Sequence, residues 1–470
     1  MSAAARLNVL CGHLNLQSAS SSSTLQQEPC SAPALPPPPA CGSLVLIGGM
    51  VMDLQAHPAG PSDVHRGGSV PGSVVQSAGG VARNVAEALA LLLTSAAGAA
   101  GGSGSSTASP PAALPLLVSA VGDDLAGSAL LRHWQELGLS TACIARLHGG
   151  ATPTVAAVFD LAGELAACVA DASLLEEQLT PQLLRSPPVA AALAAAPIVM
   201  LDGNLSPEAL QEACRQAAAA GVPVWFEPVS APKSVRAAAL LHRISFVSPN
   251  RQELAAMAAA VRQRQQQHTD RQPCTCRQQP CLCGLQSSIS GEQCCTCSQQ
   301  CSCTAGSCRG SQCAGSCCRT PAYEGQPASS GAGAEPGAQL EDLLRSMLPD
   351  IAAVLGAGVQ HVVLTLGPDG AALCRLEGDG KAVAVCHMPA LPAAVLSCSG
   401  AGDCLVAGCL FALARGLPVK AALAHGIAAS KAAVESPLNV PALDAAVVMR
   451  DAAALLTKQA TRLHLPLPSP

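Results

Sequence analysis

Short, uninterrupted apolar runs alternate with longer Ala- and Leu-rich segments through most of the chain. A continuous apolar run that ends in Gly or a polar residue is typical of a strand buried on both faces, and the Ala-rich segments favour helices. The runs predict strands at residues 44–49, 116–121, 198–201, 222–226, 244–247 and 362–366. The intervening segments predict helices at residues 83–93, 126–137, 207–220 and 343–355. This alternation predicts the α/β class, with a doubly wound, mostly parallel sheet covered by helices on both faces.

A different pattern covers residues 152–171, where two short strand-like stretches flank the turn Leu161-Ala162-Gly163. A tight turn between two such stretches predicts a β-hairpin that is separate from the main sheet. Small antiparallel strands beside a doubly wound sheet often form a lid over the site. We therefore expect lid strands in about residues 51–80 and 150–172.

Composition separates a folded domain from segments outside it. We expect the domain over residues 43–455 and a tail over residues 456–470. Residues 96–111 are rich in Gly, Ser and Ala, which predicts a flexible loop. Residues 262–338 are rich in Gln, Ser, Gly and Cys and have few aliphatic side chains, which predicts a disordered low-complexity insert. The Ser- and Pro-rich residues 1–42 also lie outside the predicted fold.

Charge and the scarcity of aromatic side chains exclude several classes of partner. A net charge of −5 over 470 residues gives no basic surface for nucleic acid or an anionic membrane. Trp134, Trp225, Tyr323 and four Phe are too few rings for a base-stacking platform. No apolar stretch reaches the length of a membrane span without Pro, Gly or charge. We expect a small-molecule substrate, and neither a nucleic-acid nor a membrane partner.

Cysteines concentrate in the second insert: 13 of the 24 lie between Cys274 and Cys318. Several of them repeat a Cys-x-Cys spacing, at which two thiolates can bind one soft ion such as Zn²⁺ or Cu⁺. No His stands at the spacing of a structural zinc finger. The cluster fits a low-complexity insert, and metal binding or redox sensing is the alternative.

The N-terminal segment contains Arg6-Leu7, five further residues and then His13-Leu14. This spacing matches the N-terminal peroxisomal signal R-L-x5-H-L, and in a helix Leu7, Leu10 and Leu14 share one face. We therefore predict a peroxisomal protein. The acid-poor composition also fits a mitochondrial or plastid transit peptide, and a segment without any signal would leave the chain in the cytosol.

A turn of small residues, from Ser399 to Gly402, leads directly into an apolar helix with Asp403 at the junction. Backbone N–H groups at a helix N-terminus favour an anion. A carboxylate placed there beside an incoming hydroxyl is a candidate general base. The turn therefore predicts the machinery that moves a phosphoryl group onto an alcohol, with ordinary helix capping by Asp as the alternative.

Three further stretches combine Gly or Pro with polar side chains. In Gly79–Asn84 the two Gly allow close backbone approach, and Asn84 projects from the start of a helix. After the predicted strand at 244–247, Asn250 and Glu253 lie on one face of an opening helical turn. The segment Thr365–Gly370 closes another predicted strand, and its two Gly allow a ligand to approach the backbone.

These motifs occur in the order found in PfkB-type, ribokinase-like carbohydrate kinases, and the chain resembles that family over about residues 43–455 outside the two inserts. The resemblance implies a ribokinase-like fold, ATP as co-substrate and Mg²⁺. It implies that Asp403 is the base and that the backbone amides of Gly400, Ala401 and Gly402 stabilise the phosphoryl group. It implies substrate binding by Asp53, Gly79, Gly80, Arg83 and Asn84. It implies nucleotide binding by Asn250, Thr365, Gly367 and Gly370, and Mg²⁺ binding through water by Glu253.

Two properties of the family do not transfer directly to this chain. Ser397 stands where many relatives have an Asp that helps to hold a monovalent cation, so a potassium requirement is left open. Lid strands in the family often pair between subunits, which makes a homodimer an expectation by resemblance alone.

Within the family, three stretches are most similar to the pseudouridine kinases of plants and algae: residues 79–87, 158–167 and 426–436, the last followed by Asn439-Val440-Pro441. The resemblance implies ATP-dependent phosphorylation of the 5′-hydroxyl of pseudouridine to pseudouridine 5′-phosphate, in pseudouridine breakdown. The pathway partner would be a pseudouridine-5′-phosphate glycosidase. The alternatives are a ribokinase or another nucleoside kinase of the family, and a thiol-rich metal- or redox-binding protein on a kinase scaffold.

The residues that recognise the base are not assigned by these motifs. Thr154 and Glu164 in the predicted lid are candidate contacts to ribose or base, and a solvated turn position is the alternative for Glu164. His425 and Lys431 lie near the part of the chain that lines the adenine pocket in relatives, but a His on an Ala-rich helix is more often simply packed.

Overall fold

The computed structural model describes residues 42–60, 63–65, 67–100, 113–162, 165–269, 336–457 and 460–467. The predicted targeting signal, the cysteine cluster between Cys274 and Cys318, residues 101–111 of the expected loop and Glu164 lie outside these residues. Within the described part, none of the helices combines the length and hydropathy that crossing a membrane requires.

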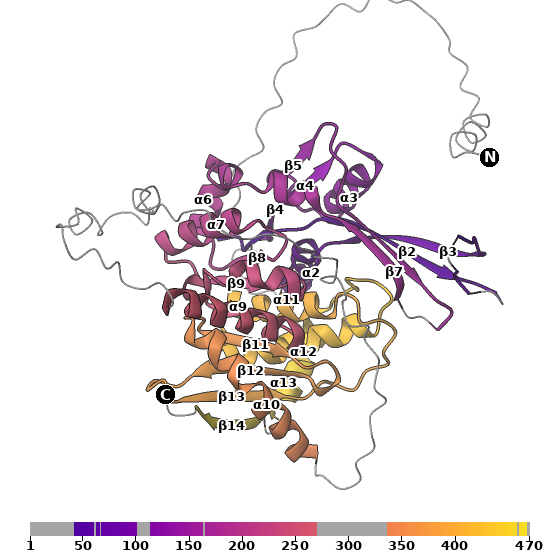
Figure 1. Ribbon diagram of the computed structural model, residues 1–470. Helices are drawn as coiled ribbons and strands as arrows, with labels where there is room; N and C mark the ends of the chain where they lie inside the picture. The colour runs from indigo at the N-terminus through magenta and orange to yellow at the C-terminus, as the bar shows by residue number, and fades with distance from the viewer. Residues whose placement is uncertain are drawn as a thin grey trace, which may run out of the picture. The chain divides into compact units, whose positions relative to one another are not determined.

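Ten strands form the main sheet: β1 (Val45–Ile47), β4 (Leu116–Gly122), β5 (Ile144–Leu147), β8 (Val199–Asp202), β9 (Val224–Glu227), β10 (Phe246–Val247), β11 (His361–Thr365), β12 (Ala371–Leu376), β13 (Ala382–Met388) and β14 (Thr461–Pro466). Their order across the sheet is β14-β13-β12-β11-β10-β9-β8-β1-β4-β5 (Figure 1). Neighbours from β5 to β11 are parallel, whereas β11 to β14 are antiparallel. The predicted α/β class with a mostly parallel sheet is confirmed.

Helices cover both faces of the main sheet. One core contains side chains of α2 (Val81–Ala100), α3 (Leu125–Glu136), α11 (Ala401–Ala414), α12 (Val419–Val434) and α13 (Ala445–Thr457). The other contains side chains of α4 (Ser173–Gln178), α5 (Pro181–Leu184), α6 (Pro187–Ala195), α7 (Pro207–Ala219), α9 (Arg251–Thr269) and α10 (Pro336–Gly356), and the short α8 (Ala231–Ser234) packs against α9. Side chains of β1 alternate between the two cores, because Leu46 packs into the first and Val45 and Ile47 into the second.

A separate four-stranded sheet contains the strands that were predicted to form a lid. Its strands are β2 (Val51–Pro58), β3 (Gly72–Gly79), β6 (Thr154–Phe159) and β7 (Leu165–Asp171), in the order β3-β2-β6-β7. Strands β6 and β7 pair antiparallel, so the predicted hairpin is confirmed. Figure 1 shows β2, β3 and β7 extending away from the main sheet. From here on, these four strands are called the lid sheet.

The structure corrects three predicted boundaries. The segment expected as a tail contains β14, in which polar residues alternate with Leu463 and the fully buried Leu465, so the sheet extends beyond residue 455. Helix α2 continues to Ala100 because Ala favours helix, so the expected loop does not begin at residue 96. Helix α9 continues to Thr269, and Arg262 Nη2 donates to Asp350 Oδ1 at 2.7 Å, so the insert does not begin at residue 262.

The connectivity of the sheet predicts where a ligand binds. From β1 the chain proceeds to β4 on one side, and it later returns to β8 on the other side of β1. In open α/β sheets, ligands bind outside the carboxyl ends of the strands where the order reverses in this way. At that edge β1 leads into Gly49, β8 ends at Asp202 and β9 ends at Glu227.

Candidate active site

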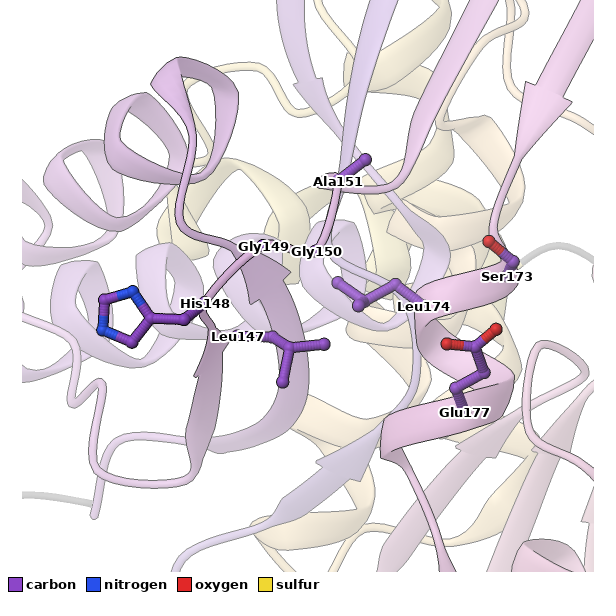
Figure 2. Close-up of a pocket in the computed structure, with 8 residues that line it drawn as sticks. All are labelled: Leu147, His148, Gly149, Gly150, Ala151, Ser173, Leu174 and Glu177. Atoms are coloured by element: carbon purple, nitrogen blue, oxygen red, sulfur yellow. The ribbon is translucent and has the colours of Figure 1, made fainter.

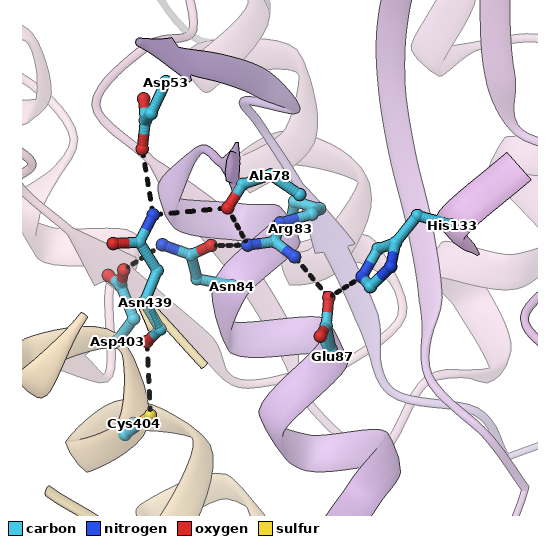
Figure 3. Close-up of polar contacts among 9 residues, drawn as sticks. All are labelled: Asp53, Ala78, Arg83, Asn84, Glu87, His133, Asp403, Cys404 and Asn439. Carbon is cyan, nitrogen blue, oxygen red and sulfur yellow. Dashed lines mark hydrogen bonds and ion pairs between the residues drawn. The ribbon is translucent and has the colours of Figure 1, made fainter. Parts of the chain in front are cut away.

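Asp403 lies in the first turn of α11 and points toward the start of α2 (Figure 3). The residue before the helix, Gly400, has φ of +73°, which directs the turn into the helix. The side-chain amide of Asn84 donates from Nδ2 to Asp403 Oδ2 at 2.6 Å, across 319 residues of sequence. The structure therefore brings together the first and the last of the four sequence motifs.

The surroundings of Asp403 raise the pKa of its carboxyl. Burial raises the pKa of this carboxyl from an ordinary 3.8 to about 6, and the neighbouring carboxylates of Asp202 and Asp53 act in the same direction. The hydrogen bond from Asn84 and the positive charge of Arg83 oppose the rise in pKa. A carboxyl with a pKa near 6 is ionised at neutral pH and is a stronger base than an ordinary Asp, which suits proton removal from an alcohol.

The Gly79–Asn84 motif forms the turn from the lid sheet into α2. Gly80 has φ of +94°, and a Cβ there would overlap the carbonyl oxygen of Gly49, so the turn requires Gly at this position. Asp202, which the sequence motifs did not identify, fixes the same turn: its Oδ2 accepts from the backbone N–H of Gly49 at 2.8 Å and of Ala82 at 3.3 Å. Its sequence signal is an acid directly after a buried apolar strand.

Arg83 lies beside Asn84 and is almost completely buried. Its Nη2 donates to the carbonyl oxygen of Ala78 at 2.7 Å and to Asn84 Oδ1, and its Nη1 pairs with Glu87. His133 Nε2 lies 2.9 Å from Glu87 Oε2 and extends this chain of contacts to α3 (Figure 3). Both terminal nitrogens of Arg83 have partners, and the contact with Asn84 Oδ1 orients the Asn84 amide. The substrate contact implied by resemblance stays a prediction.

The Arg83–Glu87 pair leads to a prediction about stability. In Glu87→Gln the buried guanidinium loses its charged partner, which should lower the free energy of unfolding by about 3 kcal/mol. Glu341 and Arg345 have the same i,i+4 spacing on α10 but are exposed, so Glu341→Gln should cost no more than about 0.5 kcal/mol. Urea denaturation of the two variants measures the difference, and equal losses of stability would contradict the importance of the buried pair.

Asp53 projects from β2 toward the same region. Its Oδ2 accepts a hydrogen bond from Asn439 Nδ2 at 2.9 Å. Burial raises the pKa of Asp53, while the bond from Asn439 and the charge of Arg83 lower it. The carboxylate is thus positioned near Asn84 and Asp403 and can accept hydrogen bonds from hydroxyl groups of a ligand.

A cavity of about 830 Å³ lies at the other side of the α11 N-terminus. The predicted nucleotide residues Asn250, Thr365, Gly367 and Gly370 line it, together with Ala401 and Gly402. The turn at Ser399–Gly402 is called the anion-binding turn from here on, after the role that its sequence predicts. Apolar side chains of Leu391, Val395, Leu405, Ile427 and Val434 also line it. The cavity has the size and the mixed lining of a site for a nucleotide, and its floor reaches the N–H groups of α11.

Asn250 and Glu253 cap helix α9 reciprocally. Glu253 Oε2 accepts from the backbone N–H of Asn250 at 2.9 Å, and Asn250 Oδ1 accepts from the backbone N–H of Glu253 at 3.0 Å. Burial raises the pKa of Glu253. The two residues lie together as expected, but their side chains contact the helix end, and only Asn250 lines the large cavity.

Glu227 is a second buried carboxyl that the motifs missed. Burial raises its pKa well above the ordinary value, the negative charges of Glu253 and Asp403 add to the rise, and the Ser248 hydroxyl donates to it. A divalent cation would relieve this accumulation of carboxyl groups, and oxygen ligands are those that Mg²⁺ prefers. Glu227 and Glu253 therefore fit Mg²⁺. In the described residues no cluster of three or more His, Cys, Asp or Glu could hold a metal, so further ligands would be phosphate and water.

Other candidate residues have structural partners. The Thr154 hydroxyl donates to the carbonyl oxygen of Thr152 at 2.9 Å. His425 is buried and lies 2.7 Å from the carbonyl oxygen of Ala421, as expected for a packed side chain. Lys431 lines the large cavity but pairs with Asp451 at 3.1 Å.

A smaller cavity of about 240 Å³ lies between the segment Leu147–Ala151 and the start of α4 (Figure 2). Ser173, Leu174 and Glu177 form its other wall. None of the residues predicted for catalysis or binding lines it, so it is separate from the site built around Asp403.

The doubly wound sheet, the turn at Ser399–Gly402, the buried carboxyl of Asp403 and the large cavity together fit a site that transfers a phosphoryl group to an alcohol. The model of the pfkB family carbohydrate kinases matches residues 42–271 and 339–444, and the chain belongs to this family. It is therefore a sugar or nucleoside kinase, that is, a phosphotransferase with an alcohol group as acceptor.

The chain is also similar to individual members of the family. The chain is 30% identical to the pseudouridine kinase of Arabidopsis thaliana over 84% of this chain and 92% of the relative. It is 28% identical to the pseudouridine kinase of Escherichia coli strain K12 over 45% of this chain and 59% of the relative. The structure of Arabidopsis thaliana ribokinase complexed with ribose and ATP matches with a TM-score of 0.56 and 17% identity, covering 88% of this chain and 99% of that one, which confirms the ribokinase-like fold.

Proposed function

We propose that this kinase transfers the γ-phosphoryl group of ATP to the 5′-hydroxyl of pseudouridine, giving pseudouridine 5′-phosphate and ADP. The single observation that carries the catalytic part is the pairing of Asn84 with Asp403 at the N-terminus of α11. The choice of acceptor is supported by the 30% identity to the Arabidopsis thaliana pseudouridine kinase over most of both chains. The product is a substrate for a glycosidase that cleaves the C–C glycosidic bond.

Each group at the site has a defined task in the proposed reaction. Asp53 and Asn84 hold hydroxyl groups of the ribose, so that the 5′-hydroxyl lies against Asp403. Asp403 accepts the hydroxyl proton as the oxygen attacks the γ-phosphorus, the bond from that phosphorus to the β–γ bridging oxygen breaks, and ADP leaves. Backbone N–H groups of Gly400, Ala401 and Gly402 stabilise the charge on the transferring group. The lid sheet excludes water, which limits hydrolysis of ATP.

Mg²⁺ is the metal that the proposed reaction requires. When bound, it would supply positive charge that offsets the negative charge of the nucleotide phosphates. Glu227 and Glu253 are the residues of this chain that would hold it, directly or through water. Asn250 would hold the nucleotide phosphates from the same end of the cavity.

The acidity of Asp403 gives a pH prediction. The base must be ionised, and its pKa is raised to about 6, so kcat/KM for the acceptor should fall as the pH drops through about 6. The hydrogen bond from Asn84 lowers the pKa of Asp403, so Asn84→Ala should move this fall to higher pH. Steady-state rates measured between about pH 5 and pH 9 test both effects. A profile that stays flat down to an ordinary Asp pKa would contradict the assignment of the base.

A panel of acceptors tests the proposed substrate. Purified protein is incubated with ATP, Mg²⁺ and pseudouridine, uridine, adenosine or ribose, and ADP formation is followed. We expect kcat/KM for pseudouridine to exceed that for each other acceptor by at least about tenfold, because pairing of polar groups with the correct base discriminates strongly. If the enzyme prefers ribose or another nucleoside, pseudouridine is not its substrate, but the assignment as a kinase stands.

A further inference from the structure

Asn439 lies in the loop between α12 and α13 and is buried, with 5% of its surface exposed. It begins Asn439-Val440-Pro441, which follows one of the stretches that resemble pseudouridine kinases. Figure 3 shows its side chain between Asp53 and the residues of the Asp403 region. Its contacts reach both Asp53 and Ser399, the first residue of the turn that precedes Asp403.

The amide nitrogen of Asn439 faces the lid sheet. Nδ2 donates to Asp53 Oδ2 at 2.9 Å on β2 and to the carbonyl oxygen of Ala78 at 3.2 Å on β3. Both N–H groups are thus used, one on the carboxylate proposed to hold the ribose and one on the backbone of the neighbouring strand. The contacts fix the position of Asp53 relative to the end of the lid sheet.

The oxygen atoms of Asn439 face the anion-binding turn. The Ser399 hydroxyl donates to Asn439 Oδ1 at 2.6 Å, and Ser399 is the first residue of the turn. The main-chain oxygen of Asn439 lies against Gly400, so closely that a Cβ at Gly400 would overlap it. The same oxygen is 3.9 Å from the thiol sulfur of Cys404. Asn439 therefore supports the turn through both its side chain and its backbone.

The chemistry of these partners specifies an amide. Nδ2 faces a carboxylate and a carbonyl, which can only accept hydrogen bonds, whereas Oδ1 faces a hydroxyl that can donate. Asp at this position would place an acceptor against Asp53, and a side chain without polar atoms would satisfy neither end. A residue that only filled space would not need this arrangement.

We propose that Asn439 is a positioning residue that joins the nucleoside-binding carboxylate of Asp53 to the anion-binding turn at Ser399–Gly402, so that binding of nucleoside and of nucleotide are energetically coupled. This inference rests on the proposed function, in which the two sites hold the two substrates. A nucleoside bound to Asp53 stabilises the existing arrangement of Asp53, Asn439 and Ser399, which holds the turn in the form that accepts the terminal phosphate. By thermodynamic reciprocity, nucleotide in the cavity tightens the binding of nucleoside.

The coupling is measured by isothermal titration of nucleoside with and without a saturating, non-hydrolysable ATP analogue and Mg²⁺. In the wild-type enzyme the analogue should tighten nucleoside binding by about tenfold or more. In Asn439→Ala this factor should fall below about twofold, while the affinity for the analogue alone changes little. A coupling factor that is unchanged in Asn439→Ala would overturn the proposal.

Two further variants separate positioning from simple packing. Asn439→Asp keeps the size of the side chain but turns a donor toward Asp53 into an acceptor, so it should weaken nucleoside binding more than Asn439→Ala does. Ser399→Ala removes the contact at the other end and should also lower the coupling factor. If Asn439→Ala weakens nucleoside binding more than Asn439→Asp does, the side chain only fills space and the proposal fails.

Asn204 provides a matched control. It is also buried, its Nδ2 donates to the carboxylate of Asp202 at 3.0 Å, and Lys233 donates to its Oδ1 at 2.6 Å, but neither partner belongs to the lid sheet or to the turn at Ser399–Gly402. Asn204→Ala should therefore lose stability while keeping the coupling factor. Loss of coupling in both variants would assign the effect to general loosening of the fold and would contradict the inference.

The acceptor in these titrations is whichever compound of the panel the wild-type enzyme phosphorylates. If that compound is not pseudouridine, the proposed substrate is wrong and the coupling can still be measured. If the wild-type enzyme shows coupling and Asn439→Ala retains it, the inference about Asn439 is wrong and the proposed function stands.

Discussion

Asp403→Asn should lower kcat by about 1,000-fold while the protein remains folded, because the amide cannot accept the proton of the acceptor hydroxyl. The replacement has nearly the same shape, and its Oδ1 can still accept the hydrogen bond from Asn84. Binding of both substrates should consequently change much less than the rate. Steady-state kinetics with ATP and the acceptor measure the loss.

Stability provides the companion measurement for Asp403→Asn. The pKa of Asp403 is raised to about 6 in the folded protein, so the favourable protonated form is present at low pH and its contribution to stability is lost as the pH rises through about 6. At pH 8 the Asn variant avoids this cost, and its free energy of unfolding should be higher by roughly 1–3 kcal/mol. A variant that loses activity only because it is unfolded would show the opposite change.

A second carboxylate at the same edge of the sheet serves as the control. Asp123 follows β4 and pairs with Arg146 at 2.6 Å and with His148 at 2.7 Å, neither of which is a residue of the Asp403 site. Asp123→Asn should change kcat by less than about threefold. Near-normal turnover of Asp403→Asn, or equal losses in the two variants, would reject Asp403 as the base.

Gly400→Ala should lower kcat by about 100-fold or more, because it displaces the turn whose N–H groups stabilise the transferring phosphoryl group. Gly400 has φ of +73°, and a Cβ there would overlap the main-chain oxygen of Asn439. The overlap is with backbone, so a side-chain rotation cannot relieve it. The turn must move, and the N–H groups of Ala401 and Gly402 move with it.

Gly416 separates this effect from backbone strain. It follows α11, also has φ of +73°, and a Cβ there would meet no atom within 4 Å. Gly416→Ala therefore carries the same cost of a left-handed conformation, about 1–2 kcal/mol in stability, without the overlap. We expect normal kcat for Gly416→Ala, and a similar loss of kcat in both variants would show that strain, not the position of the turn, is responsible.

Much of the fold follows from local pattern. Strands such as β1 and β8 are buried on both faces and are uninterrupted apolar runs, so the sequence predicts them directly. Strand β14 was missed because its signal is a short alternation of polar residues with Leu463 and Leu465, beyond the segment that resembles a kinase. Its assignment depends on pairing with β13, which is a tertiary contact that no local pattern contains.

Site residues that belong to a sequence motif were predictable, whereas site residues that only the fold brings together were not. Asn84 and Asp403 follow Gly-containing turns that predict a close approach of backbone and ligand. Asp202 and Glu227 each stand alone after a buried strand, and their importance arises because the strands end at one edge of the sheet. Asn439 and Asp53 are 386 residues apart in the sequence, so their contact could be found only in the folded structure.

The proposed transfer of a phosphoryl group from ATP to the primary hydroxyl of pseudouridine has one most direct test. The product formed from ATP, Mg²⁺ and pseudouridine is isolated, and its proton-coupled phosphorus-31 spectrum is recorded. A phosphate monoester at the 5′-position couples to two protons and gives a triplet, and this is the predicted result. A doublet from a secondary ester, or ADP formed without any nucleoside phosphate, would contradict the claim.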